Sequence, residues 1–183
     1  WDWRDDWAES WAMAGPPPAW AVGMGGSLSD DGWDIAADGA GGALVTGGFD
    51  SNANATFGNT TLTGAGDKDI FVARLTGAGD VTWAINMGGS GADTAYAIAA
   101  DGAAGASFVT GYFQGTATFG NTTLTSFGAR DIFVARVSGA GDVTWAVSMG
   151  GTGKDDGWGI AADGVGGALV TGDFRNQAAW FGS

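Results

Sequence analysis

Three acidic, glycine-rich loops carry the residue types best suited to hold a metal ion. They contain Asp30, Asp93 and Asp155, in the sequences GGSLSD, GGSGAD and GGTGKD. The last two match the start of the G-G-x-G-x-D calcium nonapeptide, but that motif stacks at nine-residue spacing, whereas these loops lie about 62 residues apart. They therefore predict only single calcium sites, completed by backbone carbonyls. Turn chemistry alone also places glycine and aspartate in such loops, and we favour that interpretation.

The chain contains no histidine and no cysteine. The commonest general base, a thiolate nucleophile, structural zinc sites and disulfides are therefore excluded. The adjacent acids Asp30-Asp31 and Asp155-Asp156 could be considered as the carboxylate pair of a glycosidase. Neighbours on a strand point to opposite faces, however, and the second loop has Asp93-Thr94 instead. We therefore predict a protein that is not an enzyme and has no certain cofactor.

Three aromatic residues occupy one recurring position, directly before the segments DIAAD, AIAAD and GIAAD. They are Trp33, Tyr96 and Trp158, and aromatic rings in such a row could stack on sugar rings. The alternative is packing between repeats, which we favour because large aromatic side chains dominate protein cores.

Three N-glycosylation sequons begin at Asn54, Asn59 and Asn121, all in a polar, threonine-rich stretch that should be exposed. They predict a glycoprotein if the source is eukaryotic, although such short motifs also arise by chance.

The net charge is −13, from seven basic and twenty acidic residues. Because nucleic-acid affinity comes largely from Lys and Arg at phosphates, this composition argues against a nucleic-acid partner and against an anionic membrane. No stretch approaches the roughly 20 apolar residues of a transmembrane helix. The acidic excess indicates high solubility, cation binding or tolerance of salt.

Internal repetition organises the chain. The segments WAVGMGG, WAINMGG and WAVSMGG begin at Trp20, Trp83 and Trp145, and the similarity continues through each unit. The spacing divides the chain into an N-terminal segment (1–19), two repeats (20–82 and 83–144) and a third, incomplete repeat (145–183).

Each repeat reads as strands and turns. Val81, Trp83, Ile85 and Met87 alternate with smaller or polar residues, which indicates a strand with one buried face. Residues 70–73 are continuously apolar, as in a strand covered on both faces. Asp-Gly turns and TGAGD loops mark hairpins, and the FGNTTLT stretch predicts a small extra one. The predicted fold is all-β: tandem four-stranded antiparallel units, similar to propeller blades.

The order of these motifs (WAxxxGG, IAxDG, VTGxF, TxFGNTTLT, DIFVAR) resembles the SBBP repeat, a β-propeller-related repeat, over residues 20–183. The resemblance implies an all-β repeat architecture and an extracellular or cell-surface location. It implies no catalytic residues.

The N-terminal segment (1–19) is predicted to form a contact surface. Trp3, Trp7 and Trp11 share one side of a helix, or the segment supplies a strand to the incomplete third repeat. With Trp20 they form the predicted donor side of a self-association. The predicted acceptor side comprises Val170, Phe174, Trp180 and Phe181.

We therefore expect a secreted or cell-surface structural protein that self-associates through its termini into an oligomer or filament. The alternative is a carbohydrate- or calcium-binding propeller module, cut from a longer chain.

Overall fold

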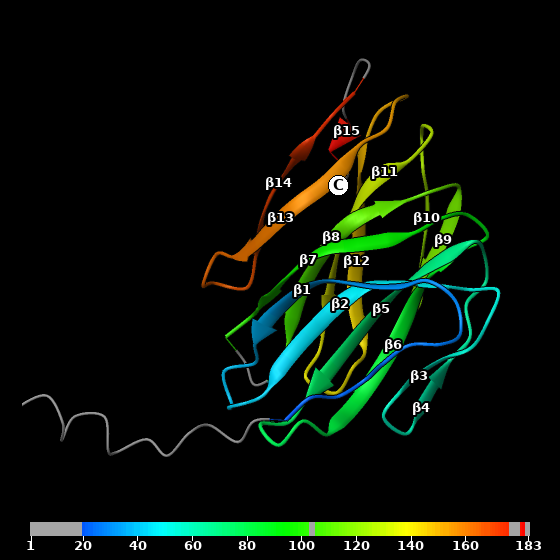
Figure 1. Ribbon diagram of the computed structural model, residues 1–183. Helices are drawn as coiled ribbons and strands as arrows, with labels where there is room; N and C mark the ends of the chain where they lie inside the picture. Colours follow the sequence, from blue (N-terminus) through cyan, green and yellow to red (C-terminus); the bar gives the residue numbers. More distant parts are fainter. Residues whose placement is uncertain (1–19, 103–104, 176–179, 182–183) are drawn as a thin grey trace, which may run out of the picture.

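The computed structural model describes residues 20–102, 105–175 and 180–181 of the 183-residue chain. Every element in these ranges is a β-strand, and all the strand pairs are antiparallel (Figure 1). The prediction of an all-β, antiparallel fold is therefore confirmed. The strands of the described residues do not close into a propeller ring.

Two four-stranded meanders form the body of the molecule. The first meander comprises β1 (Asp30–Ala37), β2 (Ala43–Asp50), β5 (Lys68–Leu75) and β6 (Val81–Gly89). The second meander comprises β7 (Thr94–Ala100), β8 (Ser107–Phe113), β11 (Asp131–Val137) and β12 (Val143–Gly150). A third pair, β13 (Asp156–Ala162) and β14 (Ala168–Asp173), follows them.

Each meander spans a boundary of the sequence repeats. Trp83 starts the second repeat in sequence, yet it lies on β6, which pairs with β5 of the first repeat. Trp145 likewise lies on β12 in the second meander. The position of the sequence motif therefore does not determine which strands pair in one meander.

Small hairpins, predicted from the FGNTTLT stretches, pair with the tryptophan-bearing segment at the start of the same sequence repeat. They are β3 (Ala55–Phe57) with β4 (Thr60–Leu62), and β9 (Thr116–Phe119) with β10 (Thr122–Thr125). Gly25 pairs with Thr56, and Gly88 on β6 pairs with Thr118, so the second hairpin attaches to the first meander. β15 (Trp180–Phe181) pairs with β12 in the same way, at Gly150. Backbone pairing thus joins β9 to the first meander and β15 to the second.

The two meanders pack face to face, with β1 and β2 against β7. We call the face that carries Leu44, Ile70 and Val72 the leading face, and the opposite face the trailing face. The leading face of the first meander is buried against Ile98 and Phe133 on the trailing face of the second, in one hydrophobic core. The third pair follows in the same order, with β13 against β7 and β8 (Figure 1).

The central strands are buried on both sides, as the continuous apolar run predicts. Ile70, Phe71, Val72 and Ala73 are each at most 4% exposed. Alternate residues of β5 contribute to two different cores, because Phe71 and Ala73 belong to a second cluster on the trailing face of the first meander. The first meander is thus one layer between two cores.

Candidate functional site

The predicted aromatic residues form one row across the three repeats. The rings of Trp33 and Tyr96 meet edge to face, with centroids 5.4 Å apart, and those of Tyr96 and Trp158 stack at 4.5 Å. Trp33 and Trp158 remain 52% and 50% exposed at the two ends of the row. The rings therefore pack between repeats, as favoured from the sequence, while glycan binding at this row stays a prediction.

A β-bulge places each of these rings. The pairing register shifts between Gly32 and Asp34 on β1, and at the equivalent points on β7 and β13. The residue without a partner in the pairing register is Trp33 on β1, Tyr96 on β7 and Trp158 on β13. A bulge re-aims one side chain at a fixed place on a strand, so three equivalent bulges bring three rings into line.

A tryptophan contact recurs in the first and second repeats. The indole nitrogen of Trp20 donates to the carbonyl of Gly77 at 2.9 Å, and that of Trp83 donates to Gly139 at 3.0 Å. The acceptors lie in the hairpin loops TGAGD (76–80) and SGAGD (138–142) of the first and second meanders. The ring lies over a glycine of that loop, Gly79 or Gly141, where an added Cβ would come within 2.7 or 3.1 Å of the indole. These tryptophans therefore attach the segment that precedes each meander to a hairpin loop of that meander.

An ion pair recurs within each meander. Arg74 on β5 donates to Asp38 after β1 through Nε (2.9 Å) and Nη2 (2.7 Å), and Arg136 binds Asp101 in the same way. The backbone N–H of Ala40, the arginine and the N–H of Gly42 hold the pKa of Asp38 below its ordinary value. The first and second meanders thus share one arginine–aspartate arrangement.

The aspartates predicted as calcium ligands accept backbone hydrogen bonds in their loops. Asp30, Asp93 and Asp155 accept from the N–H groups of Gly26, Gly89 and Gly151, at 2.6–2.7 Å. Asp93 also accepts from Gln114 and Asp155 from Arg175. Within the described ranges, no three acidic side chains come together as metal ligands. These hydrogen bonds stabilise the turns, and calcium binding by the three aspartates stays a prediction.

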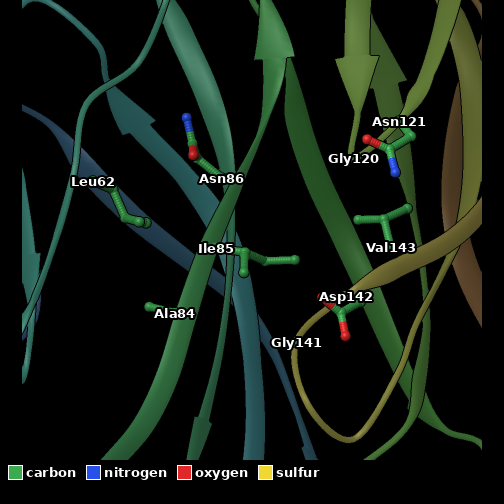
Figure 2. Close-up of a pocket in the computed structure, with 9 residues that line it drawn as sticks. All are labelled: Leu62, Ala84, Ile85, Asn86, Gly120, Asn121, Gly141, Asp142 and Val143. Atoms are coloured by element: carbon green, nitrogen blue, oxygen red, sulfur yellow. The ribbon is translucent and has the colours of Figure 1, made fainter.

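The sequon residues Asn54, Asn59 and Asn121 are all exposed. Asn121 lines a cavity of about 380 Å³ between β6 and the loop before β12. Figure 2 shows Ile85 and Val143 on opposite sides of this cavity. Modification of these asparagines stays a prediction.

The predicted assembly residues are only partly described. Trp20 is 42% exposed and makes the loop contact above, and Phe174 is 42% exposed beyond β14. Val170 lies half-buried on β14. Backbone pairing places Trp180 and Phe181 against β12. Trp3, Trp7 and Trp11 lie outside the described residues.

The outward faces expose residues whose equivalents are buried between the meanders. Ile98 is 4% exposed, whereas Ile35, at the same position of the first meander, is 65% exposed. Leu44 and Phe108 are fully buried, whereas Leu169, their equivalent on β14, is 63% exposed. Both outward faces are hollowed: a cavity of about 290 Å³ adjoins Val45, and one of about 390 Å³ adjoins Leu169.

Sequence reasoning missed three of these features, although each has a signal in the repeats. The bulges fall where an aromatic residue interrupts a run of small residues. The tryptophan contact links WAxxMGG to TGAGD, and the ion pair links IAADG to DIFVAR. Recurrence alone did not show which recurring segments touch.

No helix among the described residues is long and apolar enough to cross a membrane. A scan against models of known protein families and a search of curated proteins both find no match to this chain.

Proposed function

We propose that this chain is a non-catalytic structural protein whose blade-like repeats stack face to face, and that it self-associates through the two ends of the stack. The resemblance of its motifs to SBBP repeats supports a secreted or cell-surface setting. The observation that carries the proposal is the exposure of Ile35 and Leu169 at positions that are buried between the meanders.

The two outward faces differ, which sets the geometry of association. The first meander exposes a trailing face, at Ile35, and the third pair exposes a leading face, at Leu169. Inside the chain, a leading face always meets a trailing face. A second copy would therefore add head to tail, and such contacts produce rings or filaments rather than two-fold dimers.

Light scattering across a concentration series tests the proposal. We expect the mass of the wild-type particle to rise with concentration. Ile35→Asp and Leu169→Asp should each give monomers, because a charge would be placed in an apolar contact. Val165→Asp is the matched control: Val165 is 91% exposed, in the loop between β13 and β14.

Mixing the two monomeric variants makes the test specific. Each retains the face that the other has lost, so an equimolar mixture should form 1:1 dimers that grow no further. A wild type that stays monomeric, or a Val165→Asp control that dissociates as fully as the other variants, contradicts the proposal. Circular dichroism establishes that each variant is folded.

A further inference from the structure

One edge of β14 is covered by no strand of the described residues. In the two meanders the equivalent strands, β2 and β8, pair along that edge with β5 and β11. β14 pairs with β13 alone. An open edge of this kind can receive an extended peptide through main-chain hydrogen bonds.

The side chains around this edge match those that hold β5 and β11. Thr46 and Thr110 donate to the carbonyls of Phe71 and Phe133 at 2.8 and 2.7 Å. Thr171 occupies the same position of β14 and is exposed.

Asp163 lies in a turn with the same backbone hydrogen bonds as the turn in which Asp38 binds Arg74. Asp38 accepts from the N–H groups of Ala40 and Gly42 while it binds Arg74. Asp163 accepts from the equivalent N–H groups of Val165 and Gly167, at 2.8 Å each. Within the described residues, no arginine or lysine forms an ion pair with Asp163.

A second acidic position lies near the far end of the same edge. In the first meander, Lys68 pairs with Asp31, and its Cε would lie 3.0 Å from a Cβ added at Gly48. In the third pair these two positions are Asp156 and Asp173, and Asp173 pairs with the exposed Arg175 at 2.8 Å. Asp156 is fully buried and bonds Arg130 through one oxygen, whereas its Oδ1 has no partner within the described part of the chain.

We propose that the β14 edge binds an extended strand from another chain, with a basic residue near Asp156 and Asp173 and an arginine six positions later at Asp163. The repeats contain this pattern as KDIFVAR and RDIFVAR. Leu44 and Phe108 lie opposite Arg74 and Arg136, so the incoming arginine lies opposite Leu169. This binding site lies on the third pair, which also takes part in the proposed stacking. Binding of a strand at the β14 edge does not depend on stacking.

A labelled peptide with the sequence of residues 67–76 provides the probe. Fluorescence anisotropy measures its affinity for the Ile35→Asp variant, so that stacking does not compete. Hydrogen exchange should show new protection of the amides of residues 168–173. Changing the arginine (Arg74→Gln) or the lysine (Lys68→Gln) of the peptide should each weaken binding by about tenfold, since each removes a charge-assisted hydrogen bond.

Protein variants locate the arginine site. Asp163→Asn should weaken binding of the unaltered peptide and abolish its preference over the Arg74→Gln peptide. Asp142→Asn removes an exposed carboxylate from another loop and should change neither quantity. The inference is overturned if the peptide does not bind, if both peptides bind equally well to the unaltered site, or if residues 168–173 gain no protection. Because the peptide comparison leaves the protein unchanged, it does not depend on how Asp163→Asn folds.

Discussion

At the scale of single residues, Asp93 is a carboxylate enclosed by protein. It is 0% exposed, and its partners are the backbone N–H groups of Gly89 and Gln114. Burial raises the pKa of Asp93 to about 6, the two hydrogen bonds oppose that rise, and the nearby charge of Asp69 adds to it. Burial also raises the pKa of Asp131, one repeat later.

This burial makes stability depend on pH in a specific direction. Unfolded aspartate has a pKa near 3.9, so the folded protein binds more protons than the unfolded chain between about pH 4 and 6. The contribution of Asp93 to the free energy of unfolding should therefore fall as pH rises through that window, by up to about 3 kcal/mol. Urea denaturation at a series of pH values measures it.

Asp93→Asn provides the comparison for this prediction. The variant loses one backbone acceptor, so its overall stability is lower. Between pH 4 and 6, the free energy of unfolding of this variant should nevertheless fall less than that of the wild type. Asp131 should contribute to the fall that remains. Parallel pH profiles for the two proteins would show that Asp93 is not the cause.

At the scale of elements, the contact between a tryptophan strand and the next hairpin loop depends on glycine. Gly141 has φ +91°, and an added Cβ would lie 3.1 Å from the ring of Trp83. Gly141→Ala should destabilise the protein through both backbone strain and this close approach, by roughly 1–3 kcal/mol. Thermal or urea denaturation measures the loss.

Gly164→Ala separates the two effects. Gly164 has a similar φ of +81°, but no atom lies within 4 Å of an added Cβ. It should therefore show the backbone cost alone and destabilise less than Gly141→Ala. Equal losses would mean that the tryptophan ring moves aside without cost.

Sequence reasoning succeeded for the elements where local chemistry decides structure. Apolar runs, Asp-Gly turns and the TGAGD loops predict the strands and hairpins, because side-chain period and turn geometry are local properties. It could not assign Trp83 to the sheet of the preceding repeat, since strand pairing depends on distant partners. The bulge at Tyr96 and the pairing of Arg74 with Asp38 likewise appear only once the strands are in register.

At the scale of the whole molecule, charge opposes association. Each copy carries a net charge of −13, so copies repel one another while their apolar faces attract. Raising sodium chloride from 50 to 500 mM should therefore increase the mass of the wild-type particle, because salt screens exposed charges but leaves apolar contact intact. Light scattering at fixed protein concentration measures this, and dissociation at high salt would indicate that complementary charges hold the copies together.

The pairing of each small hairpin with an earlier segment also sets an order of events during synthesis. Gly88, at the edge of β6, pairs with Thr118, which lies about thirty residues later in the chain. Gly25 and Thr56 pair at a similar sequence separation. On a ribosome, we therefore expect the edge of β6 to stay open until about thirty further residues have emerged. A pause in elongation at that stage would leave one unpaired edge available to chaperones or to a neighbouring nascent chain.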